Sequence, residues 1–119
     1  MSLRFEISKA FALSKDILLE DSFVEENQDL MELVVEDHLM VYVPCYMLWC
    51  LKYKDSELVD LNIVNALSEY GRCKSKDSFR SLCSEEQRKV VHKFLVWCSK
   101  EICTADIVQI ERALKNWSS

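Results

Sequence analysis

The chain has one glycine, Gly71, and one proline, Pro44, in 119 residues. Sheet-rich folds need both residue types for hairpin turns and bulges, so this scarcity argues against a β fold. Half of the residues are hydrophobic, which is enough for one core in a chain of this length. We therefore predict a single all-α domain over residues 1–119, a bundle of about five to six helices.

Apolar residues recur at helical spacing along the whole sequence. The predicted helices cover about Leu3 to Leu18, Glu25 to Val43, Cys45 to Tyr53, Glu57 to Tyr70, a segment that starts at Ser84 and a last segment that starts near Thr104. Pro44 lacks a backbone N–H, so we expect it to break the central helical region. The segment after it is apolar all round, as is typical of a buried central helix.

Local signals place several helix ends. Gly71 stands where a left-handed residue would end the fourth helix. In the basic connection over 72–83, Phe79 and Leu82 are the predicted apolar anchors. The run from Ser84 to Gln87 has the pattern of a capping box. The inward residues of the last two helices are predicted to be Val90, Val91, Phe94, Leu95 and Cys98, and then Ile107, Ile110, Leu114 and Trp117.

Charge is distributed unevenly. Residues 1–60 have a net charge of −8, whereas residues 61–119 have a net charge of +3. From Asp16 to Leu51 there are nine acidic residues and no Lys or Arg. Phosphate binding needs a basic surface, so this balance disfavours a nucleic-acid partner. It favours a basic protein partner instead, since complementary charge speeds association and selects partners.

Four of these acids, spaced i, i+4, i+7 and i+11, would form one stripe on the predicted second helix: Glu25, Asp29, Glu32 and Glu36. Like charges at this spacing repel one another, so the stripe is not an arrangement that stabilises a helix. The structural explanation of this stripe is a solvated helix face. A docking surface for a basic partner, extended by Asp37, is the functional one.

Tyr42 and Tyr46 flank Pro44 and are the aromatic residues that we predict to anchor such a partner. The other aromatic residues are expected to form the core. The longest uncharged run, Leu39 to Leu51, is too short to span a membrane. No apolar signal core precedes it, so we expect a cytoplasmic protein.

Six cysteines and two histidines offer material for a metal or thiol site. The close pairs, Cys45 with Cys50 and Cys98 with Cys103, lack the C-x-x-C spacing of structural zinc sites. No Gly-rich turn supplies an oxyanion hole for a Cys–His nucleophile. We therefore expect reduced, buried thiols, no metal, no cofactor and no enzymatic activity.

Three sequence elements resemble an uncharacterised family of small bacterial helical proteins. They are the Tyr-x-Pro-x-Tyr element from Tyr42 to Tyr46, the capped helix from Ser84 through Leu95, and the terminal Leu-x-x-Trp from Leu114 to Trp117. In size, acidity and lack of a catalytic motif the chain is also similar to immunity proteins of bacterial toxin–immunity systems, such as those of contact-dependent growth inhibition. That resemblance implies tight binding of a cognate toxin without chemistry.

The sequence thus suggests an immunity protein that blocks the basic active site of a cognate, nuclease-type toxin. Two alternatives stay open at this point. One is a non-catalytic regulatory or scaffold domain that binds another helix through an apolar groove. The other is a thiol-dependent enzyme or redox sensor.

Overall fold

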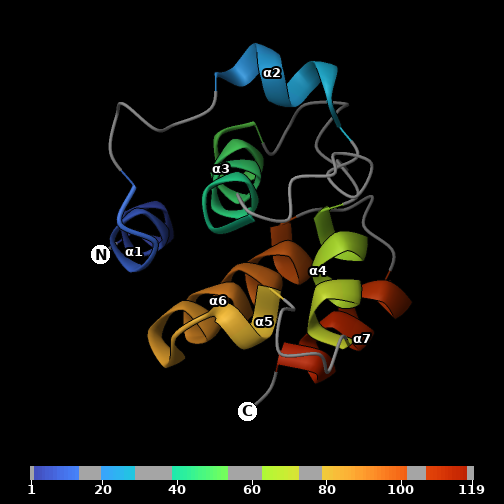
Figure 1. Cartoon of the computed structure of the whole chain (residues 1–119). Coiled ribbons are helices and arrows are strands. Elements are labelled where there is room, and N and C mark those ends of the chain that lie inside the picture. The colour runs from blue at the N-terminus through green and yellow to red at the C-terminus, as the bar shows by residue number, and fades with distance from the viewer. Residues whose placement is uncertain are drawn as a thin grey trace.

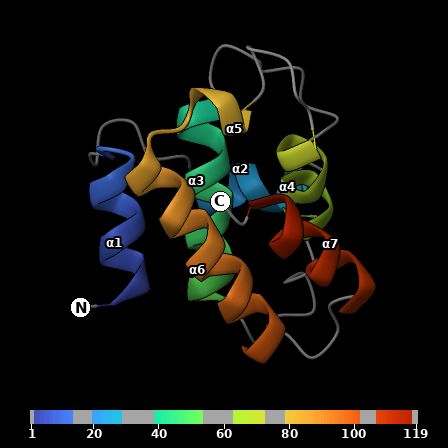
Figure 2. The same cartoon turned by 90° about the horizontal axis from the view of Figure 1, so that it is seen from below.

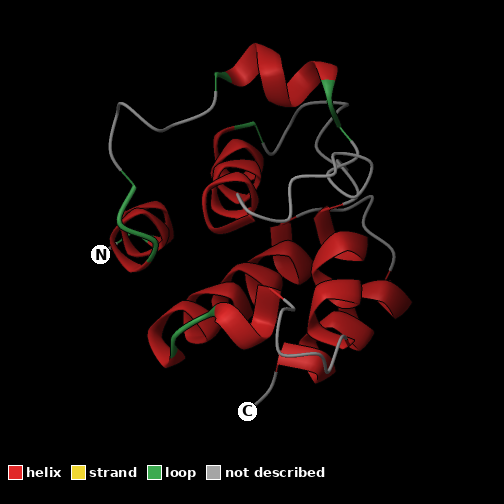
Figure 3. Ribbon diagram, viewed as in Figure 1, coloured by secondary structure: helices red, strands yellow, loops and turns green. Residues whose placement is uncertain are grey.

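The computed structural model describes residues 2–13, 20–28, 39–53, 63–72, 79–101 and 107–117. Within these ranges every regular element is a helix, and no strand is present (Figure 3). The helices are α1 (Leu3–Ala10), α2 (Asp21–Glu26), α3 (Leu39–Lys52), α4 (Ile63–Arg72), α5 (Phe79–Leu82), α6 (Glu85–Glu101) and α7 (Ile107–Trp117). The all-α prediction is confirmed.

The described helices enclose one hydrophobic core, to which each of them contributes at least one buried residue. α1 packs against α3 and α6, while α7 packs against α4 and α6 (Figures 1 and 2). α2 lies on the opposite side of α3 from α6. The Cα radius of gyration is 13.0 Å, close to the roughly 13.5 Å of a compact domain of this length.

Pro44 does not break the central helix, so that prediction is wrong. α3 is one helix from Leu39 to Lys52 with Pro44 inside it. The ring of proline is compatible with helical φ, and its cost, about 3 kcal/mol, is chiefly the lost bond to the carbonyl four residues earlier. Eight residues of α3 are buried. At about 1.5–3 kcal/mol for each large apolar side chain, their burial outweighs the proline penalty.

The first helix ends at Ala10 rather than at Leu18 as predicted. Ala12 takes a left-handed conformation with φ of 52°. Its N–H donates to the carbonyl of Lys9 (3.2 Å), and the N–H of Leu13 donates to that of Ser8 (2.9 Å). These two bonds form a Schellman motif, which glycine usually provides. Because alanine occupies the left-handed position, the sequence carried no visible stop signal.

Gly71 does not end α4 in the left-handed conformation that was predicted. It lies inside α4, and its φ is not positive. A Cβ at this position would lie 2.8 Å from Nε1 of Trp117 and 2.9 Å from Cβ of Asn116. Glycine is therefore needed because α7 approaches the backbone of α4 closely.

The capping-box prediction at the start of α6 is confirmed. The N–H of Gln87 donates to Oγ of Ser84 (3.2 Å), and the N–H of Ser84 donates to Oε1 of Gln87 (2.7 Å). The side-chain amide of Gln87 also donates to the carbonyl of Ala10 (3.0 Å), which ties α6 to the end of α1. The predicted inward residues of α6 are all buried: Val90, Val91, Phe94, Leu95 and Cys98.

Two predicted core positions are wrong. Leu82 is 51% exposed, because the four-residue α5 buries only Phe79. Ile107 is 70% exposed, so the buried face of α7 begins at Ile110. The predicted starts of the fourth and last helices, near Glu57 and Thr104, lie outside the described residues.

Candidate functional site

Glu25 lies in a helix that ends one residue later, so it does not begin a helix that continues to Val43. α2 ends at Glu26, and Asn27 has φ of −126° and ψ of 60°, which is not helical. The side-chain amides of Asn27 and Gln28 donate to the carbonyls of Phe23 and Glu25 (both 2.9 Å). Asparagine commonly bonds to nearby backbone in this way and competes with helix propagation. The prediction of a continuous helix from Glu25 to Val43 is therefore wrong at its first turn.

The remaining predicted members of the stripe cannot be placed relative to Glu25. Asp29, Glu32, Glu36 and Asp37 lie outside the described residues. Whether they share a surface with Glu25 stays a prediction.

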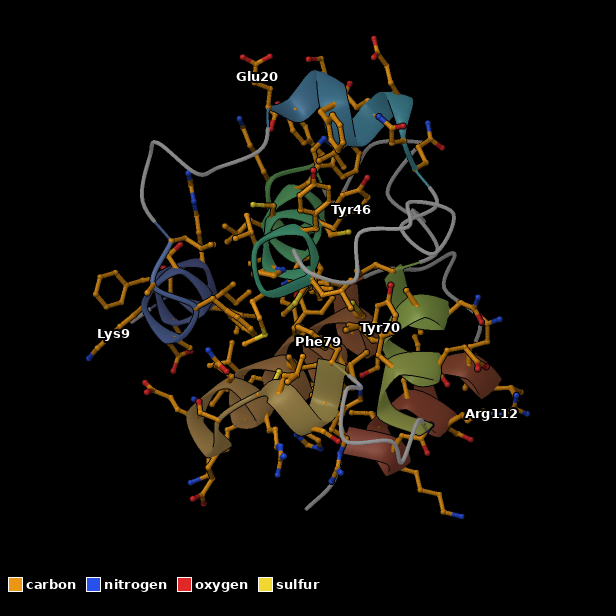
Figure 4. The ribbon with its side chains drawn as sticks, viewed as in Figure 1. Lys9, Glu20, Tyr46, Tyr70, Phe79 and Arg112 are labelled. Atoms are coloured by element: carbon orange, nitrogen blue, oxygen red, sulfur yellow. The ribbon has the colours of Figure 1, made fainter. Side chains whose placement is uncertain are left out.

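The described acidic surface is formed by α2 itself. We call Glu20, Glu25 and Glu26 together the acidic α2 face. Glu20 is the N-cap residue of α2, and Glu25 and Glu26 lie in its last turn, so the three acids mark the two ends of the helix and do not form one stripe. Glu20 and Glu26 are exposed and Glu25 is half-buried. Figure 4 shows Glu20 pointing away from the molecule at the start of α2. Charged side chains on the outer side of a surface helix form an electrostatic surface that is accessible to a partner.

Asp21 is the acidic residue in the first turn of α2, and it points towards α3. Its Oδ2 accepts from Nζ of Lys52 (2.8 Å) and from the hydroxyl of Tyr53 (2.5 Å). These two hydrogen bonds lower the pKa of Asp21, and they outweigh the opposing effect of burial. The same carboxylate raises the pKa of Lys52. Asp21 therefore holds α2 on α3 and is less available to a partner than the acidic α2 face.

The lowered pKa of Asp21 predicts a pH effect on stability. Because the unfolded carboxylate has the higher pKa, near 3.8, Asp21 contributes stability above that pH. This contribution disappears as the pH falls through the folded-state pKa. The free-energy difference between the wild type and Asp21→Asn should accordingly be largest near neutral pH and shrink below about pH 4. Denaturant unfolding at pH 7, 5, 4 and 3 measures it, and a constant difference would contradict the prediction. Glu85→Gln, at an exposed position on α6, is the control.

The two tyrosines predicted as partner anchors differ in position. Tyr42 is half-buried, and its ring meets Phe23 of α2 edge-on with centroids 5.8 Å apart. Tyr46 has no exposed surface, and its hydroxyl donates to the carbonyl of Asn27 (Figure 4). With α2 in place, Tyr46 is part of the core and is not accessible to a partner. The sequence could not reveal this, because the residues that cover it lie 19 positions away.

The described cysteines are buried thiols: Cys45, Cys50, Cys83 and Cys98. Burial raises the pKa of Cys83 to about 12, although Arg88 and Arg80 act in the opposite direction. A thiol with such a pKa is almost entirely protonated at pH 7 and is a poor nucleophile. The described part of the chain also has no group of three His, Cys, Asp or Glu side chains that could hold a metal ion.

This burial predicts slow thiol chemistry at four positions. Under native conditions Cys45, Cys50, Cys83 and Cys98 should react with iodoacetamide at least about 100-fold more slowly than in denaturant, because each sulfur is buried and shielded from the reagent. Peptide-resolved mass spectrometry over a time course measures each site separately. Fast native alkylation of any of the four would contradict this and would favour a thiol-dependent activity.

The sequence matches no protein-family model, and no curated protein or solved structure is significantly similar to it. Among the described helices, none is long and apolar enough to cross a membrane.

Proposed function

We propose that the protein is a non-catalytic immunity protein that binds a cognate bacterial toxin of the nuclease type. Its acidic surface would occupy the basic, nucleic-acid-binding cleft of the toxin and exclude the substrate. The observation that supports this most directly is the acidic α2 face. It lies on an outer helix, within a sequence window that has nine acids and no cation.

The local charge balance supports the same proposal. The adjoining helix α3 ends with the cation Lys52. Lys52 forms an ion pair with Asp21. Arg4 of α1 also acts electrostatically on Asp21. Both cations that are identified beside α2 in the described part of the chain thus act on Asp21, while Glu20 and Glu26 remain exposed. Exposed carboxylates of this kind mainly raise the association rate with a basic partner, and they do so most strongly at low salt.

The test compares two charge-neutralised variants. The variant Glu20→Gln/Glu25→Gln/Glu26→Gln removes the acidic α2 face. It keeps Asp21, which is bonded to Lys52 and Tyr53 of the neighbouring segment. Glu86→Gln/Glu101→Gln/Glu111→Gln removes the same charge from exposed positions on α6 and α7. The candidate partner is a nuclease-type toxin domain, sought among the products of the neighbouring genes. Its binding is measured by stopped flow at low and physiological salt.

We expect the α2 variant to associate on the order of tenfold more slowly at low salt, with a shallower salt dependence. The control variant should change the rate much less. Equal effects in the two variants would reject α2 as the binding surface. A wild-type chain that neither binds nor neutralises the toxic domain would reject immunity itself. A third variant with Asp29, Glu32, Glu36 and Asp37 neutralised tests whether the predicted site extends beyond α2.

The scaffold alternative has one supporting observation. Ile107 and Val108 are adjacent at the start of α7 and are 70% and 61% exposed. Neighbouring exposed apolar side chains are a common feature of protein-binding surfaces. If a pull-down captures a partner that is not a toxin, and Ile107→Ser/Val108→Ser abolishes this capture while the acidic α2 variant does not, the scaffold function is favoured.

A further inference from the structure

An aromatic stripe runs along α3 beneath α2. It consists of Tyr42, Tyr46, Trp49 and Tyr53, spaced i, i+4, i+7 and i+11 and therefore on one side of the helix. Three of the four meet α2 or its end directly. The ring of Tyr42 contacts Phe23, and the hydroxyls of Tyr46 and Tyr53 bond to Asn27 and Asp21. The ring of Trp49 packs on that of Tyr53, with centroids 4.9 Å apart.

We propose that α2 is a detachable strap: it opens from α3 as a unit while the rest of the fold remains intact, and its opening uncovers the aromatic stripe. The proposal concerns the protein alone and does not depend on the identity of a partner.

The first argument is that α2 is weak as a helix. It has six residues, far fewer than the roughly 12–15 that an isolated helix needs. Its N-cap residue, Glu20, makes no side-chain capping bond. Glu25 and Glu26 occupy its last turn, where the negative end of the helix dipole disfavours acidic side chains. α2 must therefore be held in place by its contacts with α3.

The second argument is that these contacts are few and mostly polar. Val24 is the only residue of α2 that is fully buried. Among the described residues, the other attachments that can be named are the half-buried Phe23, the bond of Tyr46 to Asn27 at one end, and the pairing of Asp21 with Lys52 and Tyr53 at the other. Segments with little buried apolar surface and solvent-accessible bonds open at lower cost than the core does.

The third argument is an unpaired donor in the stripe itself. Trp49 is 3% exposed, yet its Nε1 has no hydrogen-bond acceptor among the described residues. A buried donor without a partner destabilises the closed state, since in water the same group would be hydrogen-bonded. Opening of α2 would give this N–H access to water. By contrast, Nε1 of Trp117 donates to the carbonyl of Leu67 (2.7 Å) and gains nothing from such an opening.

Opening also has a consequence for partner binding. A cationic group that binds Asp21 must displace Lys52 and Tyr53, and such displacement favours the open state. A ligand shifts a two-state equilibrium in proportion to its preference for one of the states. Exposure of the aromatic stripe is therefore coupled to the binding of a group that engages Asp21, whereas binding at the acidic α2 face alone leaves these bonds intact.

Hydrogen exchange tests whether α2 opens separately from the rest of the fold. It is measured on the full chain by NMR at increasing urea concentrations below the unfolding transition. The reporters are the amides of Val24 and Asn27 in α2, the amides of α6, and the indole N–H groups of Trp49 and Trp117. We expect the α2 amides and the Trp49 indole to exchange together, at least about 100-fold faster than α6, with little urea dependence. The Trp117 indole should exchange with α6.

Two variants with a matched control test the contact of Asp21 with Lys52 and Tyr53. Asp21→Asn, and separately Tyr53→Phe, should speed exchange of α2 and of the Trp49 indole about 3- to 10-fold. They should speed exchange of α6 by no more than the same factor, because the bonds of Asp21 are lost both when α2 opens and when the whole protein unfolds. Glu6→Gln removes a comparable exposed pair, Lys93 with Glu6 (2.7 Å), between α6 and α1. This control should leave α2 exchange unchanged.

Three results would overturn the proposal. In the first, α2 exchanges at the rate of α6 with the same urea dependence, which would mean that it opens only when the whole protein unfolds. In the second, the Trp49 indole follows α6 instead of α2, so that α2 does not cover the stripe. In the third, the Asp21 and Tyr53 variants speed exchange of α6 but not of α2, which would mean that these bonds stay intact when α2 exchanges.

Discussion

Replacing Phe79 with alanine should lower the free energy of unfolding by about 3–5 kcal/mol. Phe79 is 1% exposed and lies where three helices meet. Its ring centroid is 6.1 Å from that of Phe11 in the turn after α1, 5.9 Å from that of Tyr70 in α4, and 5.7 Å from that of Trp117 in α7. Alanine would leave a cavity among three aromatic rings that are fixed by separate helices, so the site cannot collapse easily.

Leu82→Ala is the matched control, because it removes an apolar side chain from the same four-residue helix. Leu82 is 51% exposed, so the expected loss is within about 1 kcal/mol. Urea unfolding followed by far-UV circular dichroism measures both variants. If the two substitutions cost the same, α5 is not anchored through Phe79 and the packing described above is wrong.

Phe79 also illustrates what the sequence allowed us to predict. Its role as an anchor, the capping box from Ser84 to Gln87 and the inward face of α6 all follow from local chemistry at fixed spacing. Leu82, in the same short segment, was predicted as a second anchor and is exposed. A one-turn helix has too few residues for periodicity to identify its buried face.

The errors at Pro44, Gly71 and Ala12 have a common cause. In each case tertiary contacts decided a backbone conformation that local propensity would have assigned differently. Burial of α3 overrides the proline, and the approach of α7 determines the need for glycine. The Schellman motif around Ala12 ends α1 without glycine, and Gln87 from α6 adds a bond to the carbonyl of Ala10. The contact of α7 with Gly71 and the bond of Gln87 to Ala10 join residues far apart in the sequence, where single-sequence patterns carry little information. The Schellman bonds around Ala12 are local, but they lack the glycine that would mark them in a sequence.

The candidate site was predicted less well than the fold. The acidic character of the region was visible from composition, and the acidic α2 face lies within it. Its geometry was not visible, because an asparagine that bonds its own helix end is a weak signal in one sequence. Tyr46 was selected for its position beside Pro44, whereas its burial depends on Asn27 and α2.

The second large effect is expected at the contact between α4 and α7. Trp117→Ala should lower the free energy of unfolding by about 3–5 kcal/mol. Trp117 is 2% exposed, packs on Phe79, and donates from Nε1 to the carbonyl of Leu67 (2.7 Å). That carbonyl lies one turn before Gly71, and the missing Cβ at Gly71 leaves room for the indole to reach it. Asn116 adds a parallel bond to the carbonyl of Ser68 (3.0 Å).

Trp117→Phe separates packing from hydrogen bonding, because it keeps an aromatic ring on Phe79 and removes the donor. Its expected cost is about 1–2 kcal/mol, since the carbonyl of Leu67 keeps its intrahelical bond. Ile107→Ala, at the exposed start of the same helix, is the control and should change stability by less than about 1 kcal/mol. Urea unfolding monitored by circular dichroism compares the three variants. A cost below about 1 kcal/mol for Trp117→Ala would mean that the last turn of α7 does not dock on α4, and the close approach at Gly71 would then lose its physical basis.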